Sequence, residues 1–230
     1  MTVLEARELR KHFGGVRAVD GVSFSVAAGE RVALIGPNGA GKTTCFNLLS
    51  GQGEPDSGRI FFNEKDITSL PPRERFRLGV GRTFQVAEVF RSMTARENLG
   101  VAGCSSRETE ELLKKLELPP VADQPCSTLS YGDVKRVELG LALAAKPRLL
   151  LMDEPTAGMA VPERQGLVAL AKEISMKDGI AVLFTEHDMD VVFGFATRVL
   201  VMHEGRVIAA GTPDAVRADP QVREVYLGSP

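Results

Sequence analysis

A glycine-rich stretch near the start of the chain combines the residue types that bind phosphate. Residues 36–44 read GPNGAGKTT and fit the pattern G-x-x-x-x-G-K-[ST], between the apolar run 30–35 and a helix expected from Lys42. Glycines let backbone N–H groups converge on nucleotide phosphates, and the lysine adds positive charge at the β- and γ-phosphates. Thr43 adds a hydroxyl that can bind Mg²⁺. The predicted nucleotide-binding residues are Gly36, Pro37, Asn38, Gly39, Ala40, Gly41, Lys42, Thr43 and Thr44.

Two carboxylates follow a second apolar run. Residues 149–152 read LLLM and are followed at once by Asp153 and Glu154. Ligands of open α/β sheets bind at the carboxyl ends of strands, which is where this pair would stand. We predict that Asp153 holds the Mg²⁺ shell, whereas Glu154 polarises a water molecule for attack on the γ-phosphate. An acidic pair at a strand end is weak evidence alone, and the upstream P-loop makes it strong.

A third stretch, LSYGD at 129–133, opens a predicted helix. Ser130 as N-cap and Asp133 three residues later predict a capping box. A helix N-terminus with free N–H groups, a serine hydroxyl and Gly132 is also a phosphate site, so capping and phosphate binding are both expected here.

The elements that position these residues alternate between strand and helix, with no internal repeat, low-complexity tract or long linker. We expect strands at 3–13, 19–26, 30–35, 58–67 (63–66 within a hairpin), 148–152 and 180–185, and a hairpin at 198–209. We expect helices from 42, and at 71–78, 95–101, 109–118, 132–145, 162–177 and 212–218. This alternation predicts an α/β domain with a mostly parallel sheet, preceded by antiparallel strands.

Composition excludes several other classes of protein. The 230 residues, 43% of them hydrophobic, suit one globular domain, and the net charge of −2 gives no basic surplus for binding nucleic acid. No run approaches the ~18–20 apolar residues of a membrane span, and the first residues contain no apolar secretion segment. The three cysteines are odd in number and widely spaced, which favours a reducing cytosol.

The four motifs together resemble those of a known family. GPNGAGKTT, LSYGD, LLLMDEP and the histidine of TEHD follow one another in the order and spacing of the ATP-binding subunits of ABC transporters, over essentially the whole chain. The resemblance implies an ABC-ATPase fold in a single domain, 1–230, with a RecA-like P-loop core sheet, an antiparallel β subdomain and an inserted helical subdomain. The core and β subdomain would comprise 1–85 and 148–230, and the helical subdomain about 86–147.

The same resemblance implies roles for further residues. Phe13 matches the aromatic residue that stacks on adenine, Gln85 matches the glutamine that senses Mg²⁺ and the γ-phosphate, and His187 matches the switch histidine. Catalysis would then rest on Glu154, His187, Lys42 and Gln85, and the metal on Thr43, Gln85 and Asp153. ATP would bind with Mg²⁺ on one chain and be closed by Ser130 and Gly132 of a second, identical or related chain.

A narrower resemblance concerns the transported solute. FGGVRAVDGVSF, GRTFQ, DEPTAGM, EHDMDVVF and VREVYLG are similar to stretches of the ATP-binding subunits that energise high-affinity import of branched-chain amino acids or related amides. This implies partnership with integral-membrane permeases and, indirectly, a solute-binding protein, with no nucleic-acid partner. It implies a cytoplasmic location on the inner face of the cell membrane. The alternatives are the ATPase of an exporter or lipid transporter, a soluble non-transport ABC ATPase, and a nucleotide sensor.

The sequence departs from the family pattern at three points. Tyr131 and Asp133 replace the first glycine and the glutamine of the usual LSGGQ, while Met159-Ala160 replaces the usual acidic or amide residue of the dimer-contact loop. The segment after Gly100 is also shorter than that of the amino-acid importers. Ser130 and Gly132 are retained, which favours a competent phosphate site.

Overall fold

The computed structural model describes residues 1–227, so Gly228, the last residue of VREVYLG, lies outside the described residues. A central sheet of six strands runs in the order β10-β9-β3-β8-β7-β6. Neighbouring strands are parallel from β9 to β6, and only β10 is antiparallel to its neighbour. The strands are β3 (Arg31–Ile35), β6 (Val80–Thr83), β7 (Leu149–Asp153), β8 (Ala181–Thr185), β9 (Arg198–His203) and β10 (Arg206–Gly211). The predicted α/β class and mostly parallel sheet are confirmed.

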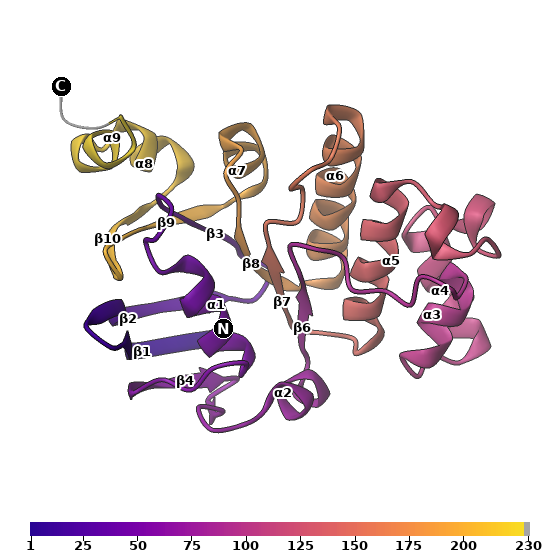
Figure 1. Ribbon diagram of the computed structural model, residues 1–230, viewed down its shortest axis with the longest axis horizontal. Coiled ribbons are helices and arrows are strands. Elements are labelled where there is room, and N and C mark those ends of the chain that lie inside the picture. The colour runs from indigo at the N-terminus through magenta and orange to yellow at the C-terminus, as the bar shows by residue number, and fades with distance from the viewer. Residues whose placement is uncertain (228–230) are drawn as a thin grey trace.

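A second, antiparallel sheet has the order β2-β1-β4-β5 and lies to one side of the central sheet (Figure 1). It contains β1 (Thr2–Phe13), β2 (Val16–Ala27), β4 (Ser57–Phe62) and β5 (Lys65–Asp66). The turn between the last two strands is made by Asn63 and Glu64, both with positive φ. The predicted hairpin at 63–66 is therefore confirmed.

Nine helices and two 3-10 turns complete the described chain. Helices α3, α4 and α5 lie together on the opposite side of the molecule from β1 and β2 (Figure 1). The helices are α1 (Lys42–Ser50), α2 (Pro72–Leu78), α3 (Ala95–Val101), α4 (Ser106–Lys115), α5 (Tyr131–Ala144), α6 (Val161–Asp178), α7 (Met189–Phe195), α8 (Pro213–Ala218) and α9 (Pro220–Leu227). The 3-10 turns are Pro119–Val121 and Cys126–Thr128.

Local chemistry explains where the sequence-based boundaries were wrong. Helix α4 begins before residue 109 because Ser105 and Glu108 form a capping box, and it ends before 118 because Glu117 has positive φ. Strand β6 was not predicted, because its four residues, VGRT, contain no apolar run. Helix α7, which is capped by the carboxylate of Asp188 accepting from two backbone N–H groups, was not predicted either.

The central strands bury both faces, which explains their unbroken apolar runs. In β7, Leu149 and Leu151 pack into a core shared with α1 and the antiparallel sheet. Leu150 and Met152 point to the other face and pack into a core shared with α3 to α6. Successive strand residues point to opposite faces, so a four-residue run serves two cores. This packing fixes the sheet edge from which the functional loops emerge.

Arg75 of α2 fastens the C-terminal end of α1, the helix that follows the P-loop. The side chain is buried, and its Nη1 donates to the carbonyls of Leu48 and Leu49 at 2.7 and 2.8 Å. It also donates to the carbonyls of Thr68 and Leu70. Burial lowers its pKa to about 10, so the guanidinium remains charged at neutral pH. The positive charge meets the negative end of the α1 dipole.

We expect Arg75→Met to lower the free energy of unfolding by about 2–4 kcal/mol, because several buried carbonyls lose their donor. Arg73→Met on the same helix is the matched control, since Arg73 is exposed. Its effect should stay within about 0.5 kcal/mol. Urea unfolding followed by circular dichroism measures both, and equal effects of the two changes would contradict the assignment.

Candidate functional site

Four loops that carry predicted site residues leave the same edge of the central sheet. The P-loop follows β3, Gln85 follows β6, Asp153 and Glu154 end β7, and His187 follows β8. Because these strands are mutually parallel, their carboxyl ends lie together. The sheet therefore brings together residues that are far apart in the sequence.

The P-loop conformation depends on glycine at two positions in particular. Gly41 has φ of 99°, and a Cβ there would lie 2.0 Å from the carbonyl oxygen of Ala18 in β2. Gly36 has φ of 156°, and its Cβ would lie 2.2 Å from the carbonyl oxygen of Met202 in β9. Any side chain would thus collide with backbone. Helix α1 starts directly after Gly41 without a side-chain cap, which leaves its first-turn amides to a ligand.

A pocket of about 220 Å³ lies over this helix N-terminus. Its wall combines most of the predicted P-loop residues with the predicted base and switch histidine. It is lined by Val16, Ala18, Asn38, Gly39, Ala40, Gly41, Lys42, Thr43, Thr44, Glu154 and His187. Val16 and Ala18 carried no sequence signal, because they are small apolar residues of an ordinary strand. The helix N-terminus and a lysine make the pocket suited to phosphate.

Lys42 points back onto its own loop. Its Nζ donates to the carbonyls of Gly36 at 2.7 Å and Pro37 at 3.1 Å. Burial lowers the pKa of the Lys42 ammonium, while the carboxylates of Glu154 and Asp153 oppose that shift. The ammonium therefore stands between backbone carbonyls and the acidic pair, where an incoming phosphate would add a stronger partner.

Glu154 is held from both sides by predicted site residues. Gln85 Nε2 donates to its Oε2 at 2.9 Å, and His187 Nε2 donates to its Oε1 at 2.7 Å. Its backbone N–H donates to the hydroxyl of Thr185, and its φ is +43°, an uncommon conformation for a residue with a side chain. A strained backbone held by specific bonds is typical of functional positions. The three side chains come from three loops, and only the sheet register brings them into contact.

Asp153 lies deeper, with its side chain 12% exposed. Thr185 donates its hydroxyl to Asp153 Oδ1 at 2.8 Å, and Arg82 Nη2 lies 3.4 Å from Oδ2. Arg82 also donates to Ser50 and Asn47 of α1. No role was predicted for Thr185 or Arg82 from the sequence, although they lie within the quoted stretches TEHD and GRTFQ. Together they hold the carboxylate between the P-loop helix and β8.

Glu186 connects the loop after Glu154 to the switch histidine, and sequence analysis also missed it. Its buried carboxylate accepts from the backbone N–H and the hydroxyl of Thr156, at 2.9 and 2.6 Å. The N–H of His187 donates to its other oxygen at 3.2 Å. A buried carboxylate needs hydrogen-bond donors. The donors to Glu186 come from the loop after Glu154 and from the N–H of His187, so the carboxylate fixes these two segments relative to each other.

Gly36, Pro37, Gln85 and Asp153 are not among the residues that line the P-loop pocket, and neither are three predicted ligand residues from other parts of the chain, Phe13, Ser130 and Gly132. Phe13 is 58% exposed at the end of β1, with Lys11 Nζ 5.7 Å from its ring centre. Ser130 is exposed at the start of α5, whereas Gly132 is buried against Glu163 of α6. None of the three is among the residues lining the pocket described above. Within one chain the structure does not bring Ser130 and Gly132 to the P-loop.

The predicted capping box at Ser130 is only half present. The Asp133 N–H donates to the Ser130 hydroxyl at 3.1 Å, as expected of an N-cap. The Asp133 carboxylate, however, accepts from that same hydroxyl at 2.9 Å instead of from the N-cap backbone. A box needs the longer glutamate or glutamine side chain to reach back, and aspartate is one methylene shorter.

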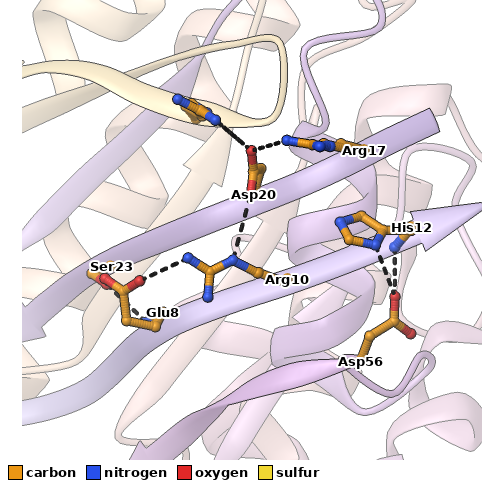
Figure 2. A network of polar contacts seen from close by, with 8 residues as sticks. Glu8, Arg10, His12, Arg17, Asp20, Ser23 and Asp56 are labelled. Carbon is orange, nitrogen blue, oxygen red and sulfur yellow. Dashed lines mark hydrogen bonds and ion pairs between the residues drawn. The ribbon is translucent and has the colours of Figure 1, made fainter. Parts of the chain in front are cut away.

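The wall formed by β2 is held by charges around Asp20 (Figure 2). Arg10 and Arg17 approach its carboxylate, and Arg206 from β10 lies 2.7 Å from Oδ2. The bond from Arg206 is the main cause that lowers the pKa of Asp20. The Asp20 N–H also donates to the Gly205 carbonyl at 2.8 Å. These contacts tie the strand that carries Val16 and Ala18 to the β9–β10 hairpin.

The fold and the site together define a P-loop nucleotide hydrolase. The ABC transporter family matches residues 19–157, and a family described as branched-chain amino acid ATP-binding cassette transporter matches residues 206–230. The chain belongs to the ABC transporter family, and it is a nucleotide-binding ATPase subunit of that family.

Two relatives cover almost the whole chain. The lipopolysaccharide export system ATP-binding protein LptB of Acidithiobacillus ferridurans is 40% identical, covering 98% of this chain and 97% of that protein. The high-affinity branched-chain amino acid transport ATP-binding protein BraF of Pseudomonas aeruginosa is 37% identical, covering 98% of both chains.

Solved structures of ATP-binding cassettes have the same fold. An ATP-binding cassette of an ABC transporter in its ADP conformation superposes with a TM-score of 0.92 at 34% identity, covering 100% of both chains. A nucleotide-free cassette gives a TM-score of 0.90, also at 34% identity and full coverage of both chains. These matches confirm the predicted ABC-ATPase fold. Across residues 1–227, the helices are all too short or too polar to cross a membrane.

We expect Lys42→Ala to weaken ATP binding about 10- to 100-fold, because a charge-assisted bond contributes about 1.5–3 kcal/mol. Lys65→Ala, at an exposed residue of the β4–β5 hairpin, is the control and should leave affinity unchanged. Isothermal titration with ATP measures both variants. An unaltered dissociation constant in the Lys42 variant, with its melting temperature retained, would refute the placement of phosphate at this lysine.

Proposed function

We propose that this chain binds ATP with Mg²⁺ in the P-loop pocket and hydrolyses it with Glu154 as general base. The observation that carries the proposal is the convergence of Gln85 and His187 on the Glu154 carboxylate at the rim of that pocket. A base must be oriented toward its water, and two donors from separate loops fix this carboxylate. His187 holds the carboxylate in place, and Lys42 faces the phosphates.

The donor set fits Mg²⁺, which prefers oxygen ligands and usually keeps several waters. Thr43 offers a hydroxyl, Asp153 a carboxylate and Gln85 an amide oxygen, since its nitrogen donates to Glu154. Thr185 orients the Asp153 carboxylate. When bound, the cation neutralises charge that develops on the β- and γ-phosphates.

A single chain gives an incomplete site, because Ser130 and Gly132 lie away from its own P-loop. The exposed Ser130 hydroxyl, on turning away from Asp133, and the first-turn N–H groups of α5 would supply donors for a phosphate held by a second chain. We propose that two ATP-binding chains pair head to tail, with Phe13 completing the adenine side. Closure then excludes water from the γ-phosphate. The pair is either two copies or this chain with a sister subunit.

We expect Glu154→Gln to lower the hydrolysis rate about 10²- to 10⁴-fold, because the amide cannot accept the proton of the attacking water. ATP binding persists, so an ATP-bound dimer accumulates. Phosphate release and size-exclusion chromatography with ATP measure the two effects. Glu204→Gln in the β9–β10 turn is the control. Rapid ATP hydrolysis by the Glu154→Gln variant would contradict the assignment of Glu154 as general base.

The membrane partner would dock on a groove between the core and the helical insertion. We propose that residues 1–85 and 148–230 form the core and β subdomain and about 86–147 the helical subdomain. A groove of about 380 Å³ is lined from both sides, by Phe76, Arg82 and Phe84 on one and by Glu88, Ala102 and Leu141 on the other. Val86 and Phe90, 69% and 53% exposed, lie in the segment after Gln85. A permease bound in this groove would sense the state of the P-loop pocket through Gln85.

We propose import of branched-chain amino acids, or related small amides, as the transport function. The similarity to BraF and the family matched at residues 206–230 support it. The chain would then act on the cytoplasmic face of the membrane with permeases and, through them, a solute-binding protein. A second candidate is export of a lipid, which the 40% identity to LptB favours.

Co-purification distinguishes these candidates. We expect the tagged chain, extracted gently from its own membranes, to recover multi-span permeases, with a sister ATPase and an exported solute-binding protein encoded alongside them. Phe90→Ala with Arg91→Ala should lose the permeases, while Met176→Ala, exposed on α6, should retain them. Lipid-export membrane proteins would instead support the second candidate. Recovery of soluble machinery alone would overturn transport.

A further inference from the structure

Two opposite charges are buried one turn apart on α5. The side chains of Lys135 and Glu138 are 1% and 3% exposed, and Lys135 Nζ lies 3.1 Å from Glu138 Oε2. They follow the exposed loop that contains Ser130, on the same helix. Neither residue lines the P-loop pocket, and the proposed mechanism gives no role to either.

Both charges are bonded to the backbone of one loop. Lys135 Nζ donates to the carbonyls of Phe84 and Gln85, at 2.5 and 3.0 Å. Glu138 Oε1 accepts from the N–H groups of Phe84 and Glu88, at 2.9 and 3.3 Å. The pair therefore holds both flanks of the segment 84–88, with Gln85 inside it.

A third contact comes from the residue that departs from the family pattern. Tyr131 donates its hydroxyl to the Gln85 carbonyl at 3.4 Å, and its ring centre lies 5.9 Å from Lys135 Nζ. Glycine at this position could not reach the loop. The start of α5 is thereby joined to the same carbonyl that Lys135 binds.

Packing alone does not explain this arrangement. Burial is the largest influence on Glu138 and raises the pKa of its carboxyl, with Lys135 opposing the shift. A buried ion pair commonly adds little stability over apolar residues of similar volume. What such a pair supplies here is four directional bonds to backbone, which apolar side chains could not make.

We propose that Lys135 and Glu138 are positioning residues that hold Gln85 against Glu154 and join it rigidly to the helix bearing Ser130. The inference rests on the proposed function, because it assigns Gln85 an effect on hydrolysis. A shift of α5 then moves the backbone of 84–88, and the Gln85–Glu154 contact of 2.9 Å changes with it. Each chain's own catalytic carboxylate is thus linked to the loop it presents to its partner.

A double-mutant cycle tests the route through Gln85. Lys135→Met with Glu138→Leu removes the four bonds that the pair makes to the loop, leaves the Tyr131 contact in place, and introduces apolar side chains of similar size. We expect the hydrolysis rate to fall about 10- to 100-fold, as small misplacements of catalytic groups do. In a Gln85→Ala background the same double change should cost less than about 2-fold, because the residue it positions is absent.

Three further variants and one direct readout complete the test. Lys135→Met with Glu138→Gln keeps an acceptor oxygen at residue 138 and nearly the same side-chain shape. It replaces the first double variant if that protein does not fold, and its hydrolysis rate should fall by an intermediate amount. Lys135→Arg retains donors and should restore most of the rate. Arg136→Met with Glu117→Leu removes a neighbouring ion pair of α5, 2.8 Å long, that does not touch the loop. Amide exchange at Phe84 and Glu88 should quicken only in the variants that lose the loop bonds.

The assays use the full chain in the assembly in which it hydrolyses ATP. A wild-type rate in Lys135→Met with Glu138→Leu, a loss equal to that of the Arg136 control, or a loss undiminished without Gln85 would each overturn this inference. A failure of the proposed function would be recognised by a different result, namely rapid ATP hydrolysis by a chain in which Glu154→Gln is the only change.

Discussion

The parallel register of β3, β8, β7 and β6 is the constraint on which the site depends. Because the strands run the same way, the P-loop, Gln85, the acidic pair and His187 emerge at one edge. A shift of one residue in β7 would exchange its two buried faces and move both carboxylates. In the register observed, Leu149 and Leu151 lie in one core, and Leu150 and Met152 lie in the other.

The loops that leave this edge are held by buried polar groups in addition to apolar packing. Thr185 holds Asp153, Glu186 holds Thr156 and the His187 backbone, and Arg75 holds the far end of α1. Each of these bonds is made in the low-dielectric interior, where leaving a polar group without a hydrogen-bond partner would lower the free energy of unfolding. The geometry of the proposed catalytic residues therefore depends on polar side chains that do not themselves line the pocket.

The departures from the family pattern have local explanations. The Asp133 carboxylate accepts from the Ser130 hydroxyl, so its charge is engaged within the chain. Met159 is 9% exposed and packs into the core beneath the helices, which accounts for an apolar residue in that loop. Tyr131 reaches the Gln85 carbonyl. None of Tyr131, Asp133 and Met159 lines the pocket over the N-terminus of α1.

The sequence by itself determined the P-loop, the acidic pair after an apolar run and the α/β class, because each rests on short-range spacing or on the apolar pattern of one element. The role proposed for His187 came from the family resemblance and not from a local pattern. Strand β6 and helix α7 were not predicted from the sequence. The four residues of β6 and the short, capped α7 carry no such pattern. Only the tertiary structure decided that Val16 and Ala18 wall the pocket, that Arg82 contacts Asp153, and that Lys135 and Glu138 bind the loop of Gln85. Those contacts join residues tens of positions apart, and strand order and helix packing alone bring such residues together.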